Sequence, residues 1–368
     1  MIRVLHVLAA LSDGGGVQVL LRNYYKEMDT ENYKFDFAVY SKRDGEVKRY
    51  FEQQGSRIYQ VTPRGRNAIK NLWQMRNIIK NGNYDIVHTH QTYLGLSTLA
   101  IAKLYGVKGR IIHTHSRVEV TSFFAKQVKK VLVLLSKKIA TDFFSCSNWA
   151  QEYFWGEGKA YEHKLMHNAI DLEKYKFSYD VREKVRKHLG LTDSFVVGHV
   201  GRFTPIKNHK FILKIFKLLK DDFEDVKLLL VGEGKLLPET KSMAAEMGLT
   251  EDIIFAGERN DVHELLQAMD VMVFPSTSEG LGIVAIEAQA AGLSVVCSEA
   301  VPREVNVTGM VKYVSLDDES GWCDAIKETK NDQRVSHLDT LKNAGYDINH
   351  EAKQLEKLYN EISGDGNS

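Results

Sequence analysis

The fold is decided by a stretch in the second half of the chain, FPSTSEGLGIVAIEA, residues 274–288. Residues 270–274 are an apolar run typical of a buried strand, and the apolar residues after the turn recur at helical spacing. The stretch therefore predicts a strand, a tight turn and a helix. Glu279 lies in the turn and Glu287 about two helical turns further on, so both can face one cleft. Such turns at the carboxyl edge of a parallel sheet bind ligands in α/β folds, although a surface Glu279 and a helix-capping Glu287 fit the same pattern.

A second loop of the same half, GRFTPIKN at residues 201–208, carries two cations. Arg202 and Lys207 flank a loop that enters a helix, and two cations beside a helix N-terminus suit a diphosphate. Solvated surface cations are the alternative. Strands expected at 195–201, 226–231, 253–257, 270–274, 293–297 and 311–314 alternate with helices. This half is therefore expected to form a doubly wound parallel sheet.

The first half opens in a similar way, with a strand at 2–9, a glycine loop at 12–16 and a helix at 17–28. Three adjacent glycines, at residues 14–16, allow backbone N–H groups to approach an anionic ligand. The loop lacks the G-x-G-x-x-G pattern, and no acidic residue ends the strand at 35–40, which argues against a dinucleotide enzyme. A loop without a ligand is the alternative. Further βα units follow and predict a second doubly wound sheet.

Two strands of the first half end in His-Thr-His, at residues 88–90 and 113–115. Alternate side chains of a strand lie on opposite faces, so one histidine of each pair is expected to face a cleft. A pair of histidines also suggests a metal, but no cluster of acidic residues accompanies either pair. No metal is therefore expected.

Residues 121–140 combine bulky apolar side chains with five lysines. An amphipathic helix of this kind can lie on an anionic membrane surface. A helix that packs on the core and exposes its lysines to solvent is the alternative.

The composition of the 368 residues is that of an ordinary globular protein, with 43% hydrophobic and 26% charged residues. The length predicts two domains. With 49 basic and 48 acidic residues the net charge is +1, so no nucleic-acid partner is expected. Three widely spaced cysteines indicate a reducing compartment, and neither a signal peptide nor an apolar run of membrane-spanning length is recognisable. A cytoplasmic protein is expected, with possible contact at the inner face of the membrane.

The motifs together resemble the large family of retaining glycosyltransferases called family four, or group 1, which have the GT-B fold. The resemblance covers the whole chain: the glycine loop, the His-ending strands, Asn-Ala-Ile-Asp at 168–171, the loop at 201–208, Gly-Glu-Gly at 232–234 and the Glu-x7-Glu block that begins at Glu279. Residues 301–309 further resemble the branch that builds capsular and extracellular polysaccharides.

The resemblance implies two Rossmann-like domains facing across a cleft: an acceptor-side domain at 1–168, completed by a C-terminal helix at about 349–363, and a nucleotide-sugar domain at 169–348. It implies catalytic roles for Glu279, His115, Arg202 and Lys207. It implies a donor site formed by Gly15, Gly16, Arg202, Lys207, Glu279, Gly280, Leu281, Gly282 and Glu287. In that site Arg202 and Lys207 neutralise the diphosphate, Glu279 and His115 approach the sugar, and Glu287 binds the ribose. Gly282 stands where the family commonly has a larger residue, which suggests a wider donor pocket.

The expected enzyme is a hexosyltransferase that needs no cofactor and no metal, since cations can stabilise the leaving diphosphate. It would move a sugar from a nucleotide-diphospho-sugar, with UDP expected, to a growing, lipid-linked glycan. A sugar-nucleotide 2-epimerase of the same fold and a non-catalytic scaffold subunit are the alternatives. The donor sugar, the acceptor, the linkage and the oligomeric state stay open at this level.

Overall fold

A computed structural model describes residues 1–11, 16–42, 44–115, 122–155 and 163–364. The chain forms two compact units. Unit 1 comprises Met1–Ala169 and Asp347–Ser368, and unit 2 comprises Ile170–Tyr346. The boundary expected from the sequence lies at residue 168, and the observed division follows Ala169.

Unit 1 contains a parallel sheet of seven strands in the order β3-β2-β1-β4-β5-β6-β7. The strands are β1 (Ile2–Leu11), β2 (Tyr33–Lys42), β3 (Ile58–Gln60), β4 (Ile86–Thr89), β5 (Gly109–Thr114), β6 (Asp142–Ser145) and β7 (Lys164–Leu165). The strand order reverses between β1 and β4, which is the point where open α/β sheets bind ligands.

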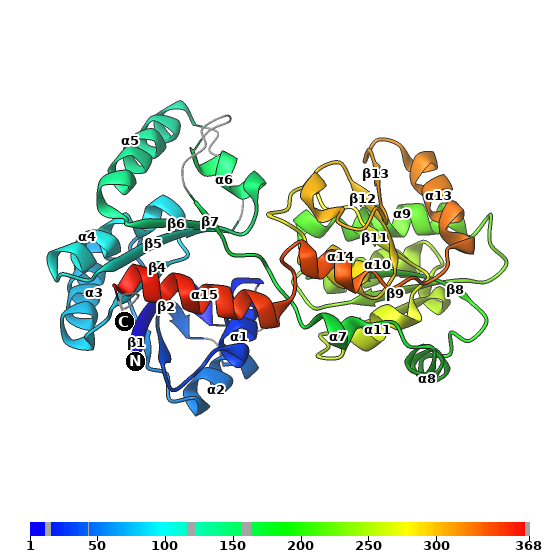
Figure 1. The fold of residues 1–368 in the computed structure, drawn as a ribbon. Helices are drawn as coiled ribbons and strands as arrows, with labels where there is room; N and C mark the ends of the chain where they lie inside the picture. The colour runs from blue at the N-terminus through cyan, green and yellow to red at the C-terminus, as the bar shows by residue number, and fades with distance from the viewer. Residues whose placement is uncertain (12–15, 43, 116–121, 156–162, 365–368) are drawn as a thin grey trace. The chain divides into compact units, whose positions relative to one another are not determined.

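Helices cover both faces of this sheet (Figure 1). They are α1 (Gly16–Glu27), α2 (Glu46–Gln53), α3 (Ala68–Gly82), α4 (Leu96–Leu104), α5 (Phe123–Ile139), α6 (Asn148–Trp155) and α15 (Ile348–Ser363), with a 3-10 turn η1 (Thr92–Gly95) before α4. Neighbouring residues of β1 pack into different hydrophobic cores, because they point to opposite faces of the sheet. Val4 packs in the core with Tyr24 and Tyr359, and Leu5 packs in the core with Met75. The C-terminal helix α15 thus belongs to the sheet of unit 1 although it ends the chain.

Unit 2 repeats the plan with six parallel strands in the order β10-β9-β8-β11-β12-β13. The strands are β8 (Phe195–Val200), β9 (Val226–Val231), β10 (Ile253–Gly257), β11 (Val271–Phe274), β12 (Ser294–Ser298) and β13 (Val311–Val314). The helices are α7 (Leu172–Tyr175), α8 (Tyr179–Leu189), α9 (His209–Leu219), α10 (Leu237–Glu246), α11 (Val262–Ala268), α12 (Ile283–Ala290), α13 (Glu319–Glu328) and α14 (Leu338–Asn343), with short 3-10 turns at Pro205–Lys207 (η2), Thr250–Asp252 (η3), Arg303–Val305 (η4) and Thr329–Asn331 (η5). Here the strand order reverses between β8 and β11.

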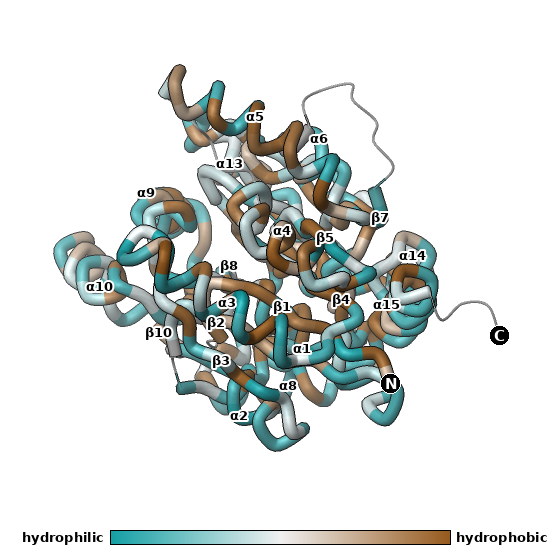
Figure 2. The backbone as a smooth tube through the Cα atoms, turned by 90° about the vertical axis from the view of Figure 1, so that its left-hand side faces the viewer, coloured by the Kyte–Doolittle hydropathy of each residue, from teal (hydrophilic) through white to brown (hydrophobic). Residues whose placement is uncertain are grey.

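The sheets form where the sequence has short, nearly continuous apolar runs, because strands covered on both faces must be apolar on both. Val196 and Val197 of β8 illustrate this, since they are both buried but belong to different cores. Figure 2 shows the same pattern as hydrophobic colour along β1, β4 and β8. The predicted architecture of two doubly wound α/β domains is confirmed.

Candidate functional site

Three charged residues of unit 2 that the sequence singled out lie on loops where its strand order reverses. The loop after β8 carries Arg202 and Lys207, and the loop after β11 carries Glu279. The backbone joins these loops, since the N–H of Thr277 donates to the carbonyl of Ile206 at 2.9 Å. Two loops that are far apart in the sequence are therefore held together at the carboxyl edge of the sheet.

An ion pair links the two loops at their side chains. Nζ of Lys207 lies 2.6 Å from Oε1 of Glu279 and 4.6 Å from the ring centroid of Phe274. The side chains of Lys207 and Glu279 are 20% and 13% exposed. A pair that is mostly shielded from water holds its geometry, because the lower local dielectric strengthens the attraction between its two charges.

Glycines position the loop of Arg202. A Cβ added to Gly232 would lie 2.2 Å from the carbonyl oxygen of Gly201, and one added to Gly234 would lie 2.5 Å from that of Phe203. The loop after β9 therefore packs directly on the backbone on either side of Arg202. The side chain of Arg202 is exposed and forms no ion pair with any residue that the structure describes. It is available to an anion.

The turn before α12 is built on Gly282, which has φ +90°. A Cβ at this position would lie 2.7 Å from Cε1 of Phe274, so a larger residue is excluded on two grounds. The expectation that Gly282 widens a donor pocket is therefore wrong, because the ring of Phe274 fills that space. Leu281 is 2% exposed and belongs to the core, which limits the contact predicted for it to its backbone; Gly280 lies beside it in the turn.

Glu287 lies on α12 and is held by a residue of α7. The hydroxyl of Tyr175 donates to Oε1 of Glu287 at 2.9 Å. Burial raises the pKa of the Glu287 carboxyl, although the hydrogen bond from Tyr175 and the charge of Lys174 act in the opposite direction. A buried carboxylate with one partner and one remaining oxygen can accept from the hydroxyls of a ligand.

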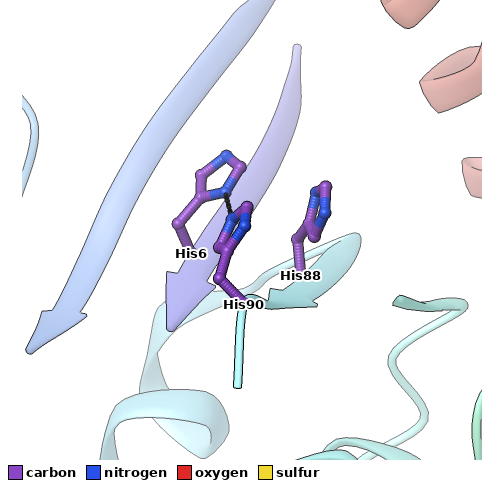
Figure 3. A group of neighbouring side chains, drawn as sticks. All are labelled: His6, His88 and His90. Atoms are coloured by element: carbon purple, nitrogen blue, oxygen red, sulfur yellow. Dashed lines mark hydrogen bonds between the residues drawn. The ribbon is translucent and has the colours of Figure 1, made fainter. Parts of the chain in front are cut away.

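The candidate site of unit 1 is a cluster of five histidines where the order of that sheet reverses. His6 lies on β1 opposite His88 of β4 in the strand register. His90 follows β4, His113 lies on β5 and His115 follows β5. Figure 3 shows His6, His88 and His90 close together, with a hydrogen bond between His6 and His90.

Both histidines of each His-Thr-His pair lie on the same face. The rings of His88 and His90 stack with centroids 4.5 Å apart, and those of His113 and His115 are 3.8 Å apart. The expectation that only one of each pair faces the site was wrong, because side chains two residues apart on a strand point to the same side.

All five imidazoles are held in the neutral form. Burial lowers the pKa of His115 from 6.5 to about 3. Burial, and after it the neighbouring imidazoles, lower the pKa values of the other members well below 6.5: His6, His88, His90 and His113. The edge of this sheet therefore offers hydrogen-bonding groups without charge.

The cluster satisfies the distance requirement for a metal. The ligand nitrogens of His6, His88 and His90, and those of His90, His113 and His115, lie within 4.8 Å of one another. Neither group includes a thiolate or a carboxylate from the described residues. A dication would therefore lack an anionic ligand in a buried place. The expected absence of a metal stays a prediction.

Sequence reasoning missed His6 of the histidine cluster, and it missed two tyrosines that hydrogen-bond to residues of the sites. His6 is a buried histidine within a mostly apolar strand, and its register with His88 became visible only in the folded sheet. Tyr175 and Tyr359 are hydrogen-bond partners from distant helices, and no local pattern indicates them. Of the predicted glycine loop, Gly16 begins α1 and Gly15 lies outside the described residues.

Comparison with known proteins assigns both halves. The family model described as Glycosyltransferase Family 4 matches residues 14–174, and that described as Glycosyl transferases group 1 matches residues 181–343. The chain is 32% identical over 371 residues to the putative glycosyltransferase EpsF of Bacillus subtilis (strain 168), covering 97% of this chain and 96% of EpsF. It is 30% identical over 281 residues to the UDP-Gal:alpha-D-GlcNAc-diphosphoundecaprenol alpha-1,3-galactosyltransferase of Escherichia coli, covering 73% of this chain and 72% of that enzyme. The capsular polysaccharide biosynthesis glycosyltransferase CapH of Staphylococcus aureus is 25% identical over 373 residues, 98% of this chain and 99% of CapH.

Solved structures share the fold at lower identity. Anabaena Alr3699/HepE in complex with UDP has a TM-score of 0.79 and 20% identity, covering 98% of this chain and 100% of that one. The predicted GT-B fold is confirmed by this likeness.

Proposed function

The chain belongs to the family 4, group 1 glycosyltransferases, and from this premise we propose that it moves a sugar from a UDP-sugar to a lipid-linked glycan with retention of configuration. The observation that carries the proposal is the ion pair of Lys207 with Glu279 beside Arg202, at the place where the strand order of unit 2 reverses. Capsular or extracellular polysaccharide is the product class, in keeping with the relatives of the chain.

The chemistry follows from the charges. When the bond between the sugar and the diphosphate breaks, the leaving nucleotide gains negative charge. Lys207 and Arg202 stabilise that charge, and Glu279 fixes the ammonium group of Lys207 in place before the substrate arrives. This arrangement makes a divalent metal unnecessary for leaving-group departure.

The remaining groups hold the donor. Glu287 accepts hydrogen bonds from the ribose, and its partner Tyr175 keeps one of its oxygens in place. His115 of unit 1 contacts the sugar as a neutral imidazole, and the backbone around Gly15 and Gly16 contacts the diphosphate. These roles come from the family resemblance, and the structure supplies a suitable environment for Glu287 and His115.

The activities of two relatives support the choice of substrates. The Escherichia coli relative uses UDP-Gal and an acceptor on diphosphoundecaprenol. A relative from Campylobacter jejuni, 27% identical over 47% of this chain, also acts on a diphospho-undecaprenol acceptor. A polyprenyl-diphosphate sugar is therefore the acceptor class that we propose.

The test is transfer by the full chain. Purified protein is incubated with each UDP-hexose or UDP-N-acetylhexosamine and a panel of undecaprenyl-diphosphate-linked sugars, and products are followed by mass spectrometry. One donor is expected to give an acceptor-dependent product whose new anomeric centre has the configuration of the donor by NMR. Inversion would contradict the proposed stereochemistry. Conversion of a UDP-sugar into its epimer without acceptor would mean that the protein is an epimerase and not a transferase.

We also propose that α5 holds the enzyme at an anionic membrane surface, where a lipid-linked acceptor resides. Six large apolar side chains of this helix are exposed: Phe123, Phe124, Val128, Val131, Leu134 and Leu135. Lys126 and Lys130 border them and are exposed too, and Figure 2 shows hydrophobic stretches of α5 interrupted by hydrophilic ones. Apolar insertion flanked by lysines suits a surface of anionic lipid. No helix of the described residues is long and apolar enough to cross a bilayer.

Liposome flotation tests this contact. The protein is expected to float with vesicles containing phosphatidylglycerol and not with phosphatidylcholine alone. The variant Lys126→Gln/Lys130→Gln should lose most of the binding. Its matched control, Lys184→Gln/Lys187→Gln, changes two exposed lysines of α8 and should float as the parent does. Equal loss of vesicle binding in both variants would mean that binding depends on net charge and not on α5.

A further inference from the structure

Hydrogen bonds arrange the histidine cluster of unit 1 into two separate chains. In the first, Nδ1 of His6 lies 3.0 Å from Nε2 of His90, and Nδ1 of His90 lies 2.7 Å from Nε2 of His115. In the second, Tyr359 of α15 bonds to Nδ1 of His88 at 2.8 Å, and Nε2 of His88 lies 3.1 Å from Nδ1 of His113. Only the first chain ends at the residue that the family resemblance places on the donor sugar.

A chain of neutral imidazoles must carry its protons in one direction. Each neutral ring has one N–H donor and one bare nitrogen that accepts. If His90 donates to His115, then His90 must accept from His6; if His90 accepts from His115, it must donate to His6. The tautomer of His115 is therefore decided by residues that never touch the ligand.

The two directions differ at the ends of the chain. Nε2 of His6 is buried beside the ring of Phe35 and has no hydrogen-bond partner among the described residues. In the inward direction each ring donates toward His6. This would leave an N–H at Nε2 of His6 without an acceptor, and would leave His115 with a bare Nδ1. In the outward direction each ring donates toward His115. This leaves Nε2 of His6 bare and places an N–H on Nδ1 of His115. An N–H at His115 can bond to a phosphate oxygen or to a sugar hydroxyl, whereas a bare Nδ1 could bond only to a hydroxyl, so the N–H serves more of the ligand's oxygens.

We propose that His6 and His90 are positioning residues that hold His115 as its Nδ1–H tautomer, so that His115 presents one N–H to an oxygen of the nucleotide-sugar. This inference rests on the proposed function for the identity of the ligand. The hydrogen-bonded chain itself rests on geometry within unit 1. His6 and His90 act through His115 and need no contact with the substrate.

The hydrogen bonds within the cluster do not favour a metal. A metal at either group of three histidines would need nitrogen atoms that already share protons, among them Nε2 and Nδ1 of His90. In the group that contains His6, a metal would also bring two positive charges next to Phe35 and Phe37, which pack on the ring of His6 with centroids 4.3 and 5.6 Å away. A hydrogen-bonded chain of neutral rings avoids this cost.

The first test reads the tautomer directly and needs no substrate. Full-length protein labelled with ¹⁵N-histidine is examined by long-range proton–nitrogen NMR, and the His115 signals are identified as those missing in His115→Gln. A single tautomer with the proton on Nδ1 is expected. His6→Phe, which removes the far end of the chain, should give His115 signals of both tautomers. Tyr359→Phe breaks the other chain by removal of one hydroxyl, and should leave His115 unchanged.

The second test is kinetic. His6→Phe is expected to lower kcat/KM for the UDP-sugar roughly tenfold, the worth of about one hydrogen bond, and Tyr359→Phe is expected to leave it within about twofold. Thermal unfolding of both variants measures any common loss of stability. Equal kinetic losses in the two variants would reduce His6 to a structural role and overturn the inference.

Other outcomes also decide. A proton on Nε2 of His115 in the parent protein, or two tautomers there, would overturn the inference. So would stoichiometric zinc or iron in the purified protein that is lost in His90→Gln. If the parent protein shows the Nδ1–H tautomer but neither binds nor turns over any UDP-sugar, the proposed function fails while the positioning of His115 stands.

Discussion

The two sheets of this protein have one topology and opposite chemistry at their edges. Unit 1 and unit 2 are both parallel, and in each the strand order reverses beside the first strand, at β1 and β4 or at β8 and β11. At that place unit 1 has five neutral histidines, whereas unit 2 has Arg202 and the pair of Lys207 with Glu279. The topology fixes where each sheet can bind a ligand, and the side chains at the strand ends fix which chemical groups can be recognised there.

Burial explains why each edge keeps its charge state. The histidines have no nearby carboxylate of the described residues in either group of three, so desolvation is unopposed and the rings stay neutral. Lys207 and Glu279 each have an opposite charge at 2.6 Å, which offsets their partial removal from water. A diphosphate needs the second kind of edge, and an uncharged sugar is better served by the first.

The largest expected difference between the units is their response to acid. The folded pKa values of the five histidines lie below the unfolded value of 6.5, so between these values the unfolded state binds protons that the folded state does not. As pH falls through 6.5, each histidine therefore removes stability, by about 1.4 kcal/mol per pH unit once fully engaged. Unit 2 has three histidines with lowered pKa values, His199, His209 and His263.

Unit 1 is therefore expected to lose protection first on acidification. Hydrogen exchange with mass spectrometry at pH 7.0, 6.0 and 5.5, corrected for intrinsic exchange rates, separates peptides of β1, β4 and β5 from those of β8 and β11. The expected order is early loss in unit 1 and later loss in unit 2. Equal or reversed order would mean that the buried histidines gain protons in the folded state without cost.

The next effect concerns the charged edge. Lys207→Ala removes the cation paired with Glu279, so the proposed leaving-group stabilisation and the side-chain link between the loops are lost, while the backbone hydrogen bond of Thr277 remains. A fall in kcat of about 100- to 1000-fold is expected, the usual cost of losing one oriented donor to a developing negative charge. The matched control is Lys210→Ala, an exposed lysine of α9. Steady-state transfer assays measure both, and an unchanged Lys207→Ala variant would remove Lys207 from the chemistry.

Much of this comparison could be predicted from the sequence, because it depends on local patterns. Apolar runs predicted the strands, and the turns after them predicted the positions of Arg202, Lys207 and Glu279. The contacts between distant segments could not be predicted in this way. Tyr359 reaches His88 across 271 residues, and Tyr175 reaches Glu287 across 112, so only the packed fold brings these partners together. The exposed apolar face of α5 is a further case, since periodicity alone does not tell a membrane face from a core face.

The smallest expected effect is at Tyr175, the neutral residue that donates a hydrogen bond to Glu287. Tyr175→Phe removes the hydroxyl that donates to Glu287, and burial already raises the pKa of that carboxyl. Without the donor the pKa of Glu287 rises further, so at a given pH less of Glu287 is the carboxylate that we propose accepts from the ribose. KM for the UDP-sugar is expected to rise about threefold to tenfold with kcat nearly unchanged, as for the loss of a binding contact. The increase should grow as pH is lowered from 8 to 6, because protonation of Glu287 is favoured there, whereas Tyr179→Phe, an exposed tyrosine of α8, should show neither change. A fall in kcat instead of a rise in KM would mean that Glu287 stabilises the transition state and does not simply bind the ribose.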